Sequence, residues 1–129
     1  DTYTVKSNFI TSKNIVGKIS LFNRNKIPEC KDKIVLIENA DPGYDWIFTK
    51  NPSALITKYG GVASHMSIRC AEMGLPAAVG CGEILFEKLK SAHKILLDCK
   101  NKEILILEYT KYDNEVEARK ILKSLGYIK

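Results

Sequence analysis

A histidine that follows a pair of glycines is the feature of this sequence best suited to chemistry. His65 ends the run Gly60-Gly-Val-Ala-Ser-His, and the hydroxyl groups of Thr57 and Ser64 lie close by in the sequence. A glycine pair lets the backbone approach a ligand closely, and the free N–H groups at the start of a helix attract anions. The helix dipole also disfavours the imidazolium form of the ring. The pattern predicts a phosphate cradle beside a neutral histidine that could accept a phosphoryl group.

The elements that must position this histidine are predicted to form a βαβ unit. A short apolar run at Ser53–Thr57 indicates a strand, and a helix is expected from Ala63 or Ser64 to Gly74. Glycine can adopt the left-handed conformation that ends a helix, and the proline two residues later cannot continue it. Ala77–Val79 then supplies a second strand. In a unit of ~30 residues the two strands should be parallel, with a right-handed crossover.

The expected helix has two different faces. At 100° per residue, His65, Arg69 and Glu72 fall on a polar side. Arg69 could reach a phosphate on His65, or could pair with Glu72 three residues further on. The opposite side is small and apolar and suits close packing on a sheet; it holds Ala63, Met66, Ser67, Cys70 and Gly74. Glycine turns also occur beside histidines without a chemical role, so the spacing alone leaves both interpretations open.

A longer pattern around the histidine is more specific. The run Thr57-Lys-Tyr-Gly-Gly-Val-Ala-Ser-His65, followed by Glu72-Met-Gly-Leu-Pro-Ala-Ala-Val-Gly80, resembles the active-site signature of the swivelling phosphohistidine domain of PEP-utilising enzymes. PEP synthase, pyruvate phosphate dikinase and enzyme I of the sugar phosphotransferase system share that domain. The resemblance implies an α/β fold, a swivelling β/β/α domain with a partly parallel central sheet. It also implies that His65 is phosphorylated, and that the residues around the phosphoryl group are Thr57, Gly60, Gly61 and Ser64.

One position departs from the signature. The related enzymes generally carry an arginine six residues after the histidine, where this chain has Ala71. Arg69 lies about 200° away from that position around a helix, so it is not a direct substitute. The departure puts pyruvate in doubt as the acceptor of the phosphoryl group.

A second resemblance concerns the loop after the strand expected at Lys33–Glu38. The segment Asp41-Pro-Gly-Tyr-Asp-Trp-Ile-Phe48, together with Ser64-His-Met-Ser-Ile-Arg69, is similar to a branch that includes the glutamine kinase of capsule biosynthesis. That enzyme phosphorylates the amide of glutamine. In the family this loop lies near the histidine, which implies that Asp41 and Tyr44 border the site; Glu72 borders it on the helix.

The resemblance also implies partners. Residues 1–129 would be one phosphohistidine domain from the C-terminal part of a longer phosphotransferase, since the chain opens with Asp1 and not Met. An ATP-grasp domain of that longer chain would bind ATP and Mg²⁺ and phosphorylate His65, which would then swing to a small-molecule acceptor. No cofactor or metal ligand is expected on the domain itself. Two alternatives remain open: a carrier phosphorylated by a separate protein in a phosphorelay, and a structural domain with an inert histidine.

Composition excludes several other classes of protein. The 129 residues suffice for one core, and no apolar run approaches the ~20 residues of a transmembrane helix. The net charge is +5, but the lysines are interleaved with acids, so we expect no nucleic-acid partner. The four cysteines are scattered without a Cys-x-x-Cys pair, which argues against zinc and favours reduced thiols in the cytoplasm.

The remaining elements are expected from local patterns. The central buried strand is Lys33–Glu38, and a short helix at Tyr44–Thr49 carries Trp46 into the core. Further expected elements are strands at Asn8–Thr11 and Ile15–Phe22 with a bulge at Gly17, a helix at Glu83–Lys90, a hairpin of Lys94–Asp98 and Glu103–Glu108, and a closing amphipathic helix at Asn114–Leu125 that packs through Val116, Ile121, Leu122 and Leu125.

Overall fold

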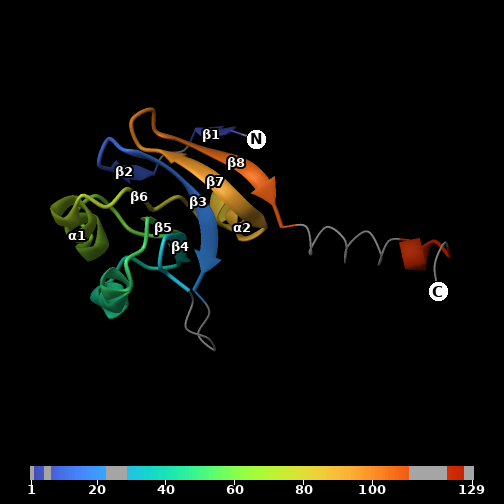
Figure 1. Ribbon diagram of the computed structural model, residues 1–129, viewed down its shortest axis with the longest axis horizontal. Coiled ribbons are helices and arrows are strands. Elements are labelled where there is room, and N and C mark those ends of the chain that lie inside the picture. Colours follow the sequence, from blue (N-terminus) through green and yellow to red (C-terminus); the bar gives the residue numbers. More distant parts are fainter. Residues whose placement is uncertain (1, 5–6, 23–28, 111–121, 127–129) are drawn as a thin grey trace.

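The apolar runs of the sequence form one mixed sheet of eight strands in a computed structural model (Figure 1), which describes residues 2–4, 7–22, 29–110 and 122–126. The strand order is β1-β8-β7-β3-β4-β5-β6-β2. The strands are β1 (Thr2–Thr4), β2 (Asn8–Ile10), β3 (Asn14–Leu21), β4 (Lys33–Ile37), β5 (Ala54–Thr57), β6 (Ala77–Val79), β7 (Ala92–Asp98) and β8 (Glu103–Tyr109). The helices are the 3₁₀ helix η1 (Pro42–Lys50) and the α-helices α1 (His65–Met73) and α2 (Glu83–Lys90).

The centre of the sheet is parallel and its flanks are antiparallel. Strands β3, β4, β5 and β6 pair in parallel. On one side β7 pairs antiparallel with β3, followed by β8 and β1, and on the other side β2 pairs antiparallel with β6. The predicted α/β class and partly parallel sheet are therefore confirmed, as are the strands and the helix of the βαβ unit.

Helices cover both faces of the sheet. The side chains of β4 and β5 are therefore buried on both sides. Ile34 and Leu36 belong to one apolar cluster, which contains the buried face of α2. Val35 and Ile37 belong to a second cluster, which contains buried residues of α1 and η1. Alternate side chains of one strand thus divide the core into two layers. The layer with α1 and η1 carries the candidate site.

Several details differ from the sequence-based expectation. Gly17 pairs regularly with Ile95, and its missing side chain makes room for Ile34, whose Cγ1 would lie 3.1 Å from a Cβ there. The irregular register occurs instead in β7, between Ala92 and Ile95. Strand β1 was not predicted; it pairs with the edge strand β8, a contact that no local pattern signals.

Two expected core contributions are also changed. Trp46 is half-buried and packs at the margin of the second cluster, with its ring 5.9 Å from that of Phe22. Most of the expected helix at Asn114–Leu125 falls outside the described residues. In the described part, Leu122 and Leu125 are exposed, so the packing expected of them is not observed. Within the described ranges, no helix has the length and apolar character needed to cross a membrane.

Candidate active site

The predicted site lies where the parallel strands β4, β5 and β6 end. The loops that follow these strands are joined by backbone hydrogen bonds. The amide of Tyr59 donates to the carbonyl of Glu38 at 2.8 Å, and the amide of Cys81 donates to the carbonyl of Thr57 at 2.9 Å. The carboxyl edge of a parallel sheet is the usual place for a ligand site, because several loops converge there. His65 is the first residue of α1 at this edge.

Helix α1 begins at Ser64, whose side chain caps it. The Ser64 hydroxyl accepts from the amide of Ser67 at 3.4 Å and donates to the Ser67 hydroxyl at 3.0 Å. Ser67 in turn donates to the carbonyl of Gly61 at 2.8 Å and is almost fully buried. These bonds fix the glycine turn against the first turn of the helix. Ser67 therefore supports the site, whereas the sequence placed it only on the packing face.

The two glycines of the turn differ in what they do. Gly60 has φ +126°, and a Cβ there would lie 2.6 Å from the Cβ of Ala40. A Cβ on Gly80 would collide with the carbonyl oxygen of Gly60, so these two backbones need glycine to pack. Gly61, in contrast, has no positive φ, and a Cβ there would meet no atom within 4 Å. The fold therefore does not require a glycine at position 61. The absence of a side chain there leaves open space beside the turn.

Several backbone amides of this turn lack a hydrogen-bond partner among the described residues. In the described part of the chain, no acceptor is found for the amides of Gly61, Val62, Ala63 and His65. Unpaired N–H groups at a helix N-terminus form a ready site for an anion. The turn thus holds unpaired donors of the kind that bind anions, next to His65.

The imidazole of His65 contacts a carboxylate that the sequence did not predict. Its Nε2 atom lies 2.7 Å from Oδ1 of Asp45, and the two side chains are 35% and 43% exposed. The neutral ring expected from the sequence stays a prediction. The ring remains accessible to a partner.

Helix η1 holds Asp45 in place. Asp41 caps this helix by accepting from the amide of Gly43 at 2.9 Å, and its residues Ile47 and Phe48 are buried in the core. Tyr44 packs edge-on against Phe22 with ring centroids 5.4 Å apart. Tyr44 also lines a pocket of about 160 Å³ together with Phe22, Glu38 and Asn39. Asp41 and Tyr44 were expected to border the site; Asp41 caps the helix that carries Asp45, and Tyr44 lies on it.

Arg69 lies on the same side as η1. Its guanidinium carbon is 5.2 Å from the centre of the Phe48 ring, and its Nε atom is buried without a hydrogen-bond partner. No ion pair joins Arg69 to Glu72 among the described residues, and Glu72 is exposed. The pairing offered as an alternative for Arg69 is therefore not observed. An unsatisfied buried donor is costly, so a role of Arg69 toward phosphate stays a prediction.

Thr57 is the last residue of β5 and is bonded to the loops that follow β5 and β6. Its side chain is fully buried, donates to the carbonyl of Tyr59 at 2.7 Å and accepts from the amide of Gly80 at 2.9 Å. The hydroxyl thus ties the ends of β5 and β6 to the turn. A direct contact between Thr57 and phosphate stays a prediction.

The thiols close to the site are not competing nucleophiles. Burial raises the pKa of Cys70 on α1 to about 12, and burial likewise raises the pKa of Cys81 to about 12. Because the thiolate is the reactive form, both groups are unreactive near neutral pH. The His65 side chain, in contrast, is 35% exposed.

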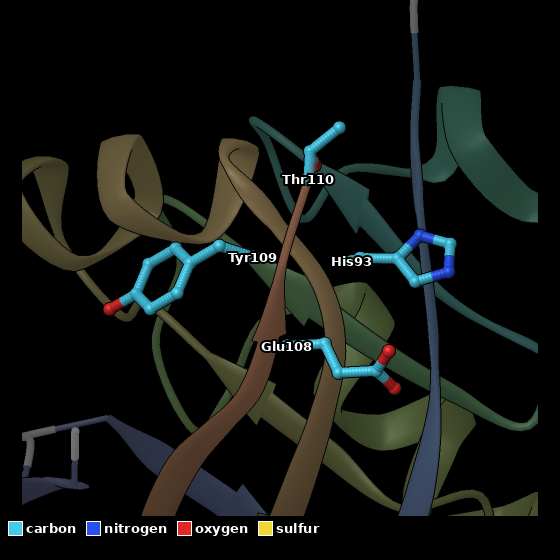
Figure 2. A pocket seen from close by; sticks show the side chains of 4 residues that line it. All are labelled: His93, Glu108, Tyr109 and Thr110. Atoms are coloured by element: carbon cyan, nitrogen blue, oxygen red, sulfur yellow. The ribbon is translucent and has the colours of Figure 1, made fainter. Parts of the chain in front are cut away.

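A second pocket lies at the end of the β7–β8 hairpin (Figure 2). It is lined by His93, Glu108, Tyr109 and Thr110, and no predicted site residue contributes to it. His93 and Glu108 extend to the same side of the hairpin, and Tyr109 extends to the other. Within the described residues, no three His, Cys, Asp or Glu side chains are grouped so that they could hold a metal ion.

The sequence contains signals that could have found the two missed residues. Ser67 stands three residues after the cap Ser64, the spacing at which a side chain reaches back to a helix start. Asp45 lies in the segment already expected near the histidine, one residue after Tyr44. No local pattern relates Asp45 to His65, because 20 residues separate them.

The chain is similar in sequence to several phosphoenolpyruvate synthases. The chain is 31% identical to the phosphoenolpyruvate synthase of Aquifex aeolicus over 88% of its length, which is 13% of that protein. It is 36% identical to the enzyme of Synechocystis sp. over 60% of the chain, and 33% identical to that of Escherichia coli over 51%. These matches span 9% and 8% of those two relatives, so the chain covers only a small part of each.

Solved structures support the fold alone. A solution NMR structure of a UPF0107 protein superposes with a TM-score of 0.63 at 12% identity, covering 84% of this chain and 100% of the other. Aconitase X of Thermococcus kodakaraensis superposes with a TM-score of 0.52 at 14% identity, covering 84% and 99%. The family described as "PEP-utilising enzyme, mobile domain" matches residues 29–113, a range that contains η1, the whole βαβ unit and His65. The chain therefore belongs to the mobile-domain family of PEP-utilising enzymes.

Proposed function

We propose that this chain is the phosphohistidine carrier domain of a longer phosphotransferase. The observation that carries the proposal is the position of His65 beside unpaired amides and the open space at Gly61. A ring nitrogen of His65 attacks the phosphorus of the donor, an N–P bond forms, and the bond from phosphorus to the donor oxygen breaks. The amides and the helix dipole stabilise the negative charge that gathers on the phosphoryl oxygens.

The donor in this proposal is ATP, bound with Mg²⁺ on an ATP-grasp domain of the same longer protein. Mg²⁺ neutralises charge on the transferred phosphate at the nucleotide site. Support comes from the relatives, which are phosphoenolpyruvate synthases of which this chain matches 8–13%. We place the protein in the cytoplasm because its four cysteines, all of which are buried, are scattered without a Cys-x-x-Cys pair.

The acceptor is proposed to be a carboxamide metabolite such as glutamine. Two sequence features support it. Ala71 stands where the related enzymes carry an arginine, and this chain has Arg69 instead. The Asp41–Phe48 segment is similar to that of the glutamine-kinase branch. These features lie together in the fold, since Arg69 covers the ring of Phe48. Pyruvate is the competing acceptor, which the names of the relatives favour.

Labelled ATP tests the carrier assignment. The full-length gene product is incubated with ATP labelled at the β or at the γ position in separate reactions, with Mg²⁺. We expect protein-bound label that is acid-labile and base-stable, that disappears in His65→Ala and that persists in His93→Ala. Label retained in His65→Ala would rule out His65 as the carrier. Label that appears only after a second protein is added would favour the phosphorelay alternative.

Phosphorus NMR tests the acceptor. The full-length protein is supplied with ATP, Mg²⁺ and either glutamine or pyruvate. We expect a new phosphoramidate signal with glutamine and little phosphoenolpyruvate with pyruvate. The reverse result would assign the protein to pyruvate chemistry and would leave the role of His65 intact.

A further inference from the structure

The contact between Asp45 and His65 has a specific chemical meaning. An ionised carboxylate only accepts hydrogen bonds, so the nitrogen that it holds at 2.7 Å must carry the proton. In the neutral ring this places the hydrogen on Nε2 and leaves Nδ1 without one. The contact therefore occupies Nε2, the ring nitrogen further from the backbone.

Both residues of the contact are held by anchored elements. Asp45 lies on η1, whose buried Ile47 and Phe48 belong to the second apolar cluster. His65 begins α1, whose Met66 lies in the same cluster and whose Met66 amide donates to the carbonyl of Ala40 at 3.4 Å. The meeting of the two side chains is thus a consequence of the fold and not of two loose surface groups.

A phosphoryl group on Nε2 cannot coexist with this contact. It would place roughly two negative charges next to Oδ1 of Asp45. Two anions at such a distance repel each other, and neither can supply the hydrogen that the contact requires. The unphosphorylated and phosphorylated domains must therefore differ at Asp45.

We propose that Asp45 is a positioning residue that holds the His65 ring by Nε2 in the unphosphorylated domain and releases that nitrogen for phosphoryl transfer. The proposal rests on the carrier function proposed above. Before transfer the ring gives its Nε2 proton to water and takes one at Nδ1. Nε2 then attacks phosphorus, and the Nδ1 proton returns to water. After transfer the carboxylate repels the bound phosphoryl group and favours its departure to the acceptor.

Phosphoramidate provides a test that needs no partner domain. Attack of a histidine nitrogen on its phosphorus forms the N–P bond and releases ammonia. The rate at His65 is measured by phosphorus and ¹⁵N NMR in the wild-type protein, Asp45→Ala and Asp45→Asn, with the exposed His93 as an internal reference. Asp32→Asn is the matched control, since Asp32 precedes β4 at the opposite edge of the parallel strands and asparagine tolerates its φ of 58°.

The expected results are a change of tautomer and a change of rate. In the wild type the ¹⁵N shifts should show the proton on Nε2, and in Asp45→Ala the two tautomers should mix. His65 should react faster in Asp45→Ala, on the order of fivefold, the factor that corresponds to the ~1 kcal/mol of a typical hydrogen bond. Asp45→Asn, which keeps an acceptor without the charge, should be intermediate. The phosphohistidine should sit on Nε2 and last longer in both variants.

Other outcomes separate the two proposals. Equal or slower reaction of His65 in both variants, or phosphate on Nδ1 in the wild type, would overturn the role of Asp45 alone. A His65 that reacts no faster than His93 in every variant would count against the carrier site itself. The Asp45→Asn protein, nearly identical in shape, guards against loss of folding in Asp45→Ala.

Discussion

The two glycines of the turn allow fold and chemistry to be separated by one matched pair of substitutions. Gly60→Ala places a Cβ 2.6 Å from that of Ala40 and 3.0 Å from Cγ1 of Val79, at a φ of +126°. Backbone strain of about 1–3 kcal/mol adds to an overpacking cost of similar size, so we expect a loss of roughly 2–4 kcal/mol in the free energy of unfolding. Gly61→Ala meets no atom and no strain. Its unfolding free energy should stay within about 1 kcal/mol of the wild type, and can rise because alanine restricts the unfolded chain.

The same pair should behave oppositely in phosphoryl transfer. The Cβ added at position 61 enters the open space in which we place the phosphate, and displacement of a reacting group by about 1 Å can slow a reaction up to roughly 100-fold. We therefore expect a 10- to 100-fold slower phosphorylation of His65 in a folded Gly61→Ala protein.

Two measurements check this reasoning. Urea unfolding followed by the fluorescence of Trp46, the single tryptophan, gives the stability of each variant. Label from ATP on the full-length protein gives the rate. If Gly61→Ala loses as much stability as Gly60→Ala, the fold needs both glycines. If Gly61→Ala folds and is phosphorylated at the normal rate, the phosphate does not bind where we place it.

Three further predictions address single groups. Arg69→Ala should cost up to about 1 kcal/mol of stability, measured by urea unfolding, because it loses an aromatic contact, and should slow transfer to phosphate; a large loss of stability with normal transfer would make Arg69 structural. Cys70 and Cys81, whose thiol pKa is about 12, should resist iodoacetamide at pH 8 until the chain unfolds, as counted by mass spectrometry; rapid labelling of the native protein would contradict their burial. The pKa of Asp98 is lowered by hydrogen bonds from Asn101, so its contribution to stability should be complete above its ordinary value of 3.8 and disappear as pH falls through the lower folded value. Asp98→Ala should therefore destabilise the protein at pH 7 and make little difference in strong acid, and a difference independent of pH would refute this.

Local sequence patterns were sufficient to predict those helices and strands whose boundaries depend on neighbouring residues. The boundaries of α1 follow from Ser64 and Gly74, which the structure shows as N-cap and as a C-cap with φ 65°. The hairpin of β7 and β8 and the helix α2 were also predicted correctly, because their apolar patterns and turns lie within a few residues. The position of His65 at a helix start on the edge of a parallel sheet could likewise be read from the sequence.

Contacts between distant segments could not be read in this way. The pairing of β1 with β8 joins residues about a hundred positions apart, and no pattern in either strand indicates that the two pair. The same holds for Gly17, where the sequence suggested a bulge and the structure shows close packing on Ile34. A glycine in the sequence shows only that a side chain is absent. The reason for its absence depends on the residue that packs against it in the fold.

The sequence by itself determined the histidine, the glycine turn and the helix that presents them, since the forces involved act between neighbours in the chain. Only the tertiary structure decided which groups surround the ring. It turned Thr57 inward to the turn, left Gly61 facing open space and brought Asp45 to Nε2 of His65. These outcomes depend on how β4, β5 and β6 align their ends. That alignment arises from the burial of both faces of the sheet, a property of the whole core that no single segment carries.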